Sequence, residues 1–204
     1  TGKTNLDQFA TGLVGTRSPY GEVKNALDPE LISGGSSSGS AVSVALGMAA
    51  FSLGTDTAGS GRVPAALNCL VGYKPSLGAW STKGVVPACA SLDCVTVFAN
   101  SLEDAEKVNL AARGVDEECC WSREYKEPLP KLPKKSCLAK DGVTFYGPYE
   151  DMYKAKWEQA KKRIEDMGIT VEYIDYTMFS KAASILYDGP WVAERWKDLG
   201  DFVE

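Results

Sequence analysis

The 204-residue chain contains no histidine. Imidazole is the general base of Ser-His-Asp triads and the commonest metal ligand among protein side chains. Its absence excludes a histidine-based triad and a histidine-ligated metal site. Any catalysis by these residues must therefore use serine, lysine or carboxylate groups.

The sequence also lacks long apolar runs and an excess of basic charge. No segment approaches the roughly 18 to 20 apolar residues that a membrane helix needs, and no secretory signal pattern opens the chain. The net charge of -5 argues against a nucleic-acid partner, because such partners normally require a basic surface. We expect a soluble protein of the cytoplasm that binds neither nucleic acid nor membrane.

The cysteines have no C-x-x-C spacing, and without histidine they have no partner for a mixed zinc site. We expect free thiols, as is usual in a reducing compartment. The six residues are Cys69, Cys89, Cys94, Cys119, Cys120 and Cys137.

Residues 31–101 carry little charge and are rich in Gly, Ala, Ser and Val, which is typical of the interior of an α/β domain. Within this stretch the pattern predicts a helix over Gly39–Ala50 and a buried strand over Phe51–Thr55. A capping box at Ser101–Asp104 predicts a further helix over Ser101–Arg113.

The proline- and lysine-rich segment Lys126–Lys135 is expected to be a surface loop or linker within one domain that spans residues 1–204. Beyond it, apolar residues at helical spacing predict a helix over residues 153–167, which Gly168 ends. The alternating residues Thr170–Ile174 predict an edge strand. The chain thus returns to a sheet after the loop.

Two turns rich in glycine and serine flank the first predicted helix and strand. The first runs Gly-Gly-Ser-Ser-Ser-Gly at residues 34–39, and the second Asp-Thr-Ala-Gly-Ser-Gly-Arg at residues 56–62. Each alone is typical of a tight connection between a strand and a helix. With one helix and one strand between them, however, Ser36 and Ser60 can meet at the same edge of a sheet.

Three other catalytic or binding motifs are relevant to this sequence. The G-x-S-x-G run at residues 35–39 resembles a nucleophile elbow, but that motif requires a histidine. No serine has a lysine three positions later, which excludes an S-x-x-K pair. Gly2-Lys3-Thr4 resembles the end of a P-loop, so a nucleotide-binding module stays an alternative.

Taken together, residues 34–39 and the run Gly54–Ala65 resemble the amidase signature family. The resemblance implies an α/β fold of that family, with a mixed β-sheet core covered by helices on both faces. It also implies a Ser-cisSer-Lys relay in place of histidine. Ser60 matches the nucleophile, and Ser36, preceded by a cis peptide bond, matches the bridging serine.

The resemblance also gives roles to residues around the second turn. Asp56 and Arg62 resemble a pair that braces it. Small residues there let the main chain approach a substrate carbonyl closely. The expected oxyanion-hole donors are the main-chain N–H groups of Thr57, Ala58, Gly59 and Ser60.

In the family, the relay lysine lies several tens of residues before the bridging serine. Only 35 residues precede Ser36 here, and Lys3 and Lys24 do not match the lysine's motif. We therefore expect the N-terminal part of the domain, with this lysine, to lie outside the chain. A catalytically silent fragment with a binding role is the corresponding alternative.

Within the family, the segments Val85–Cys89, Ser91–Cys94 and Leu186–Arg195 resemble the members that hydrolyse allophanate, a urea that carries a carboxylate. The implied reaction is acyl transfer to Ser60 with release of ammonia, and it needs neither a metal nor an organic cofactor. A general small-amide amidase of the same family is the alternative.

Recognition of so small an anion needs a cation and hydrogen-bond donors. The resemblance assigns this task to Arg195, to Tyr187 two helical turns before it, and to a main-chain contact at Gly12. It further implies fusion or association with a biotin-dependent urea carboxylase. The oligomeric state stays open, a homodimer included.

Overall fold

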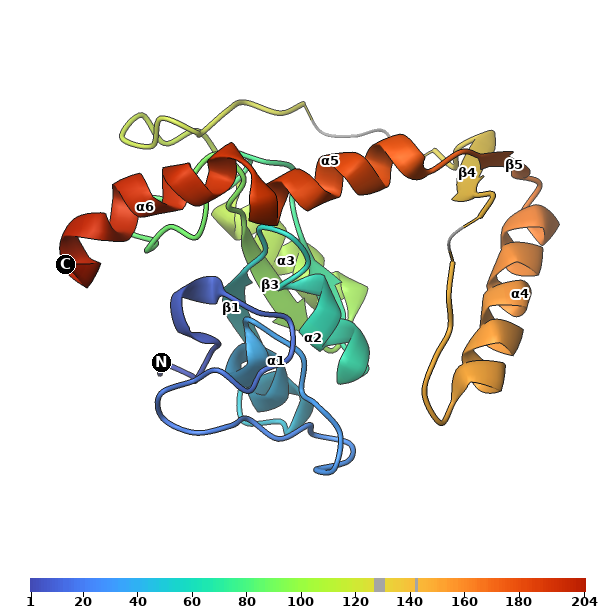
Figure 1. The fold of residues 1–204 in the computed structure, drawn as a ribbon, viewed down its shortest axis with the longest axis horizontal. Helices are drawn as coiled ribbons and strands as arrows, with labels where there is room; N and C mark the ends of the chain where they lie inside the picture. The colour runs from blue at the N-terminus through green and yellow to red at the C-terminus, as the bar shows by residue number, and fades with distance from the viewer. Residues whose placement is uncertain (127–130, 142) are drawn as a thin grey trace. The chain divides into compact units, whose positions relative to one another are not determined.

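A computed structural model describes residues 1–126, 131–141 and 143–204, and the chain forms two compact units (Figure 1). The larger unit comprises Thr1–Lys126 and Val192–Glu204, and the smaller unit comprises Glu127–Trp191. The predicted surface loop or linker Lys126–Lys135 falls at this boundary, and its residues 127–130 lie outside the described residues. A single domain over the whole chain stays a prediction.

The larger unit is built on an antiparallel sheet with the strand order β1-β3-β2. The strands are β1 (Phe51–Thr55), β2 (Val71–Tyr73) and the central β3 (Val95–Ala99). Both neighbours pair with β3. The strand predicted over Phe51–Thr55 is confirmed, and the second serine turn follows it directly. Its expected burial is wrong, because Phe51 and Leu53 are about half exposed on this edge strand.

Helices cover both faces of this sheet, because side chains alternate along β3. On one face, α1 (Ser38–Ala45) and α2 (Arg62–Leu67) pack with Phe98. On the other face, α3 (Leu102–Ala112) packs with Trp80 and the neighbouring β3 residues. The two clusters are Ala41, Val44, Ala65 and Phe98, and Trp80, Val97, Ala99 and Ala105.

The first helix is shorter than predicted. We expected it to reach Ala50, but α1 ends at Ala45. Gly47 adopts a φ of 70° and donates its N–H to the Val44 carbonyl at 3.0 Å. A left-handed glycine of this kind ends a helix, and the sequence contained that signal.

The helix predicted over Ser101–Arg113 is confirmed as α3, with Ser101 and Arg113 as its cap residues. Ser101 Oγ accepts the Asp104 N–H at 3.1 Å, as a capping box requires. One short 3-10 helix, η1 (Gln8–Ala10), precedes the first serine turn.

The smaller unit contains the parallel pair β4 (Lys135–Ala139) and β5 (Thr170–Ile174), with α4 (Glu150–Asp166) between them in the chain. Gly168, with a φ of 77°, follows α4, so the predicted helix, its glycine end and the strand are all confirmed. Among the described residues of this unit, only Ile169 is buried.

Two further helices follow, α5 (Thr177–Asp188) and α6 (Pro190–Val203). Tyr187 lies on α5 and Arg195 on α6, so they do not share one helix as their spacing suggested. Gly189 has an extended backbone and is followed by Pro190, which cannot continue the preceding helix's hydrogen bonds. Residues of α6 from Val192 onward belong to the larger unit.

Within the described part of the chain, no helix combines the length and apolar character that crossing a membrane requires. All six cysteines lie within that part and are free, as expected.

Candidate active site

The first serine turn is held by main-chain contacts with the loop before it. The Gly35–Ser36 peptide bond is cis, as the resemblance implies. Gly35 N–H donates to the Leu13 carbonyl at 2.9 Å, and the Ser36 carbonyl accepts the Asp7 N–H at 2.9 Å. A Cβ on Gly35 would collide with Asp7 Oδ2 and lie 2.8 Å from Gly15 N, so only glycine fits there.

Asp7 organises that loop. Its side chain is fully buried, Oδ2 accepts the Gly15 N–H at 3.0 Å, and Oδ1 accepts the Arg17 N–H at 2.8 Å. A buried carboxylate is stable when such donors replace its water. No sequence motif points to Asp7, because its partners are main-chain groups.

The second serine turn is braced by Asp56 and Arg62. Asp56 is fully buried and accepts Arg62 Nε at 2.9 Å, Arg62 Nη2 at 3.0 Å and the Arg62 N–H at 3.1 Å. Burial acts to raise the pKa of Asp56, but the Arg62 guanidinium and the Gly59 N–H outweigh it and bring the pKa below its ordinary value. The carboxylate is therefore ionised at neutral pH and fixes the turn.

This brace changes the set of available oxyanion donors. Gly59, expected among them, instead donates its N–H to Asp56 Oδ1 at 2.6 Å. The N–H groups of Thr57, Ala58 and Ser60 make no hydrogen bond to any residue that the structure describes. In this conformation those three are the groups that can receive a negatively charged oxygen.

The structure joins the two serine turns. Ser37 Oγ donates to the Thr55 carbonyl at 3.1 Å and accepts the Thr55 N–H at 3.0 Å. Ser36 is 1% exposed and Ser60 is 5% exposed. Neither Oγ is hydrogen-bonded to another residue within the described ranges, which leaves both hydroxyls free for proton transfer.

Arg195 is fixed to the larger unit rather than solvated. Its Nε donates to the Ala88 carbonyl at 2.6 Å, and its Nη1 donates to Thr11 Oγ1 at 3.0 Å. Thr11 precedes Gly12, so two of the predicted substrate-binding residues are close together. Leu13 continues this loop and reaches 3.6 Å from the position of a Cβ on Gly59. The loop thus extends from Arg195 to the second turn.

The third predicted substrate-binding residue, Tyr187, belongs to the smaller unit, and its side chain is 66% exposed. Its role stays a prediction.

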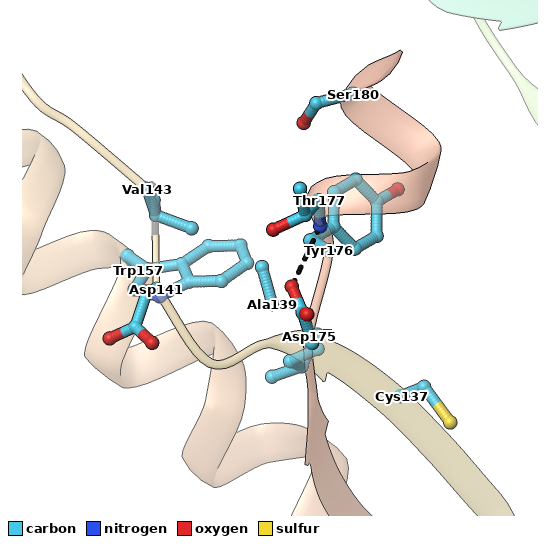
Figure 2. A pocket seen from close by; sticks show the side chains of 10 residues that line it. Cys137, Ala139, Asp141, Val143, Trp157, Asp175, Tyr176, Thr177 and Ser180 are labelled. Atoms are coloured by element: carbon cyan, nitrogen blue, oxygen red, sulfur yellow. Dashed lines mark hydrogen bonds between the residues drawn. The ribbon is translucent and has the colours of Figure 1, made fainter. Parts of the chain in front are cut away.

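The smaller unit contains a separate cavity of about 690 Å³ beyond the carboxyl ends of β4 and β5 (Figure 2). Asp141, Trp157 and Asp175 line it, and Asp175 Oδ1 accepts the Thr177 N–H at 2.9 Å. Neither Ser36 nor Ser60 contributes to this lining. Among residues 1–126, 131–141 and 143–204, no group of three or more Cys, Asp or Glu side chains is arranged to hold a metal ion.

Comparison with known proteins places this geometry in a family. The model of the family described as Amidase matches residues 1–202. The urea amidolyase of Saccharomyces cerevisiae is 47% identical over 100% of this chain, which covers 11% of that protein. A solved structure of Kluyveromyces lactis allophanate hydrolase has a TM-score of 0.93 at 47% identity, with 99% of this chain and 33% of that chain covered.

The solved structure of Kluyveromyces lactis urea amidolyase gives the same TM-score of 0.93 at 48% identity, and the match covers 99% of this chain and 12% of that chain. The chain thus spans a third or less of the length of these three relatives. Their agreement over its whole length establishes the amidase signature fold. The chain belongs to the amidase signature family.

Proposed function

We propose that this chain carries the serine half of an amide-hydrolysing active site that acts on allophanate. The observation that carries the proposal is the joining of the two turns through Ser37 and Thr55. In the described part of the chain, the hydroxyls of Ser36 and Ser60 and the N–H groups of Thr57 and Ala58 make no hydrogen bond. The similarity to an allophanate hydrolase over 99% of the chain supports the choice of substrate.

In the proposed reaction, Ser60 Oγ attacks the amide carbonyl of allophanate while Ser36 takes its proton and passes one to the relay lysine that the family resemblance implies. That lysine must be neutral to accept it. The negatively charged oxygen of the tetrahedral intermediate is received by the N–H groups of Thr57, Ala58 and Ser60. The proton returns to the leaving nitrogen, and ammonia departs.

Water then attacks the acyl group on Ser60, with the same relay as base. The ester bond breaks, Ser60 recovers its proton, and an N-carboxylated carbamate leaves. This product breaks down to ammonia and carbon dioxide without further help. No step calls on a metal or an organic cofactor.

Arg195 supplies the cation for the substrate carboxylate. Its Nε and Nη1 are used by Ala88 and Thr11, whereas Nη2 makes no hydrogen bond to the described residues. A guanidinium oriented in this way binds a carboxylate with little further loss of entropy. Gly12 belongs to the proposed binding set through its main chain, and Tyr187 is proposed for substrate binding from the family resemblance alone.

The proposal extends to cellular context. The similarity to proteins named urea amidolyase supports fusion or association with a biotin-dependent urea carboxylase, whose product would be this substrate. The six free cysteines support the cytoplasm as the place of action.

The test uses the full-length product of the gene that encodes these residues. Ammonia release is measured with allophanate, acetamide and benzamide, with Ser60→Ala as the inactive control. We expect allophanate to be strongly preferred. Equal rates with the simple amides would replace this proposal with a general amidase, and wild-type release no faster than Ser60→Ala would refute it.

A further inference from the structure

Asp93 is a buried charge that the proposed chemistry does not use. Its side chain is 3% exposed and lies just before β3. Its carboxylate accepts the Thr57 hydroxyl, the Ala88 N–H at 2.8 Å and the Cys89 N–H at 3.1 Å. Every one of these partners is a donor and favours the ionised carboxylate. Burial opposes them and raises the pKa of Asp93 above its ordinary value.

One side of Asp93 faces the oxyanion turn. Thr57 donates its hydroxyl to the Asp93 carboxylate. The main-chain N–H of Thr57 is one of the three donors of that turn that make no hydrogen bond to a described residue. The rotamer of Thr57 is therefore fixed from outside the turn. Asp56 fixes the turn from inside through Gly59 and Arg62.

The other side of Asp93 leads to Arg195 through a single residue. Ala88 donates its N–H to Asp93 and accepts Arg195 Nε on its carbonyl at 2.6 Å. Glu194 holds the same loop, because its carboxylate accepts the Ser91 N–H and the Ser91 hydroxyl, both at 2.8 Å. The loop Ala88–Asp93 is thus held at its start by the Asp93 carboxylate, and Glu194 and Arg195 of α6 hold the same loop.

The connection runs from Thr57 through Asp93 and Ala88 to Arg195. Under the proposed function, its two ends receive the two ends of one substrate, the oxyanion and the carboxylate. In allophanate those groups are separated by a single nitrogen. A small error in the distance between the two protein groups would therefore prevent both from being satisfied at once.

We propose that Asp93 is a positioning residue that sets the spacing between the oxyanion turn and the guanidinium of Arg195. The role as a spacer for substrate rests on the proposed function, whereas the physical coupling between Thr57 and Arg195 does not.

Asp93→Asn is the most informative substitution because it keeps the shape. The asparagine oxygen can still accept the Ala88 and Cys89 N–H groups. Its NH₂ group would donate a hydrogen bond to the Thr57 hydroxyl, which is the reverse of the native direction. The Thr57 hydroxyl must rotate, and the negative charge near Arg195 is lost. Asp104→Asn is the matched control, since Asp104 also accepts a serine hydroxyl and lies in the larger unit, but in the first turn of α3.

The first measurement is independent of catalysis and uses ¹⁵N NMR spectra of the full-length gene product. We expect Asp93→Asn to move both the Thr57–Ser60 amide signals and the Arg195 Nε–H signal, and Asp104→Asn to move neither set. Thr57→Val, which leaves Asp93 its two amide donors, should also move the Arg195 signal. Because that variant keeps the buried carboxylate, it decides the question even if Asp93→Asn fails to fold.

The second measurement uses kinetics of the full-length gene product on allophanate. We expect Asp93→Asn to raise KM and lower kcat, with about a 100-fold loss in kcat/KM. The double variant with Thr57→Val should lose less than the product of the single losses, because both act through one connection. A purely structural role would lower only the fraction of active enzyme and leave KM unchanged.

The outcomes separate the two proposals. An unmoved Arg195 signal in both Asp93→Asn and Thr57→Val overturns the coupling. Moved signals with unchanged kinetic constants overturn the spacer role while leaving the amidase intact. Moved signals in a protein that releases no ammonia from allophanate refute the proposed function and retain the coupling.

Discussion

The two units differ in how polar side chains are held. In the larger unit, Asp7, Asp56, Asn68 and Asp93 are nearly or fully buried, and each is hydrogen-bonded to groups distant in the fold. In the smaller unit, the ion pair of Lys135 with Glu172 and other polar contacts are exposed. The positions of the buried polar groups in the larger unit are therefore fixed by hydrogen bonds within that unit.

The largest effect that follows is on catalysis. Ser60→Ala in the full-length gene product should reduce ammonia release from allophanate by at least about 1,000-fold, because removal of a nucleophile costs most of the chemical acceleration. Ser180→Ala, at the cavity of the smaller unit in Figure 2, should stay within about 2-fold of wild type. Loss of activity in Ser180→Ala but not in Ser60→Ala would place the chemistry in the smaller unit and contradict this account.

The next effect concerns stability. Asn68 is 2% exposed, donates to the Ser33 and Pro64 carbonyls at 2.8 Å and accepts the Ala26 N–H at 2.9 Å. Asn68→Ala leaves these buried groups unpaired and should lower the free energy of unfolding by about 3 kcal/mol. The exposed Gln159 on α4 is the control, and Gln159→Ala should cost less than about 0.5 kcal/mol. Urea unfolding measures both, and similar values for the two would remove the contrast between the units.

A smaller effect is expected at the end of α4. Gly168 has a φ of 77° and open space around it, so Gly168→Ala meets no neighbour and incurs only backbone strain. We expect a loss of about 1 kcal/mol. Gly168→Asn should lose less, because asparagine tolerates this conformation. Thermal melts followed by circular dichroism measure both losses. Equal melting temperatures for Gly168→Ala and Gly168→Asn would contradict this account.

The smallest effect is on the pH dependence of stability. The folded pKa of Asp56 is lowered, so its stabilisation is complete above its unfolded pKa of about 3.9 and is lost as pH falls through the lower folded value. Asp56→Asn should therefore flatten the acid limb of stability against pH. Asp175→Asn in the smaller unit should change it least, because Asp175 is exposed. The same slope of stability against pH in the wild type and both variants would refute the assignment of this acid-dependent stabilisation to Asp56.

Local patterns allowed much of the fold to be predicted. The strand Phe51–Thr55, the cap at Ser101 and the glycine after α4 depend on neighbouring residues, and all three are confirmed. The early end of α1 near Gly47 and the break at Gly189-Pro190 also had local signals in the sequence. The predictions followed the helical spacing of the apolar residues instead and were therefore wrong at these two points.

The glycine-rich turns indicated the positions of Ser36 and Ser60. The sequence did not indicate the long-range hydrogen bonds that hold these turns in place. Asn68 reaches Ser33, Asp93 reaches Thr57, and Arg195 reaches Thr11 across long stretches of chain. Such contacts depend on the folded arrangement and have no sequence spacing to reveal them. The engagement of the Gly59 N–H by Asp56 belongs to the same class.

The most direct test of the central claim is to trap the acyl group. The full-length gene product is mixed with ¹³C-labelled allophanate, quenched in acid during turnover and analysed by peptide mass spectrometry. In acid the N-carboxylated acyl group loses carbon dioxide, so we predict one carbamoyl group, labelled at the carbonyl carbon, on the peptide that contains Ser60 and none in Ser60→Ala. Steady ammonia release with the label on another residue, or with no covalent label at any quench time, would contradict the account.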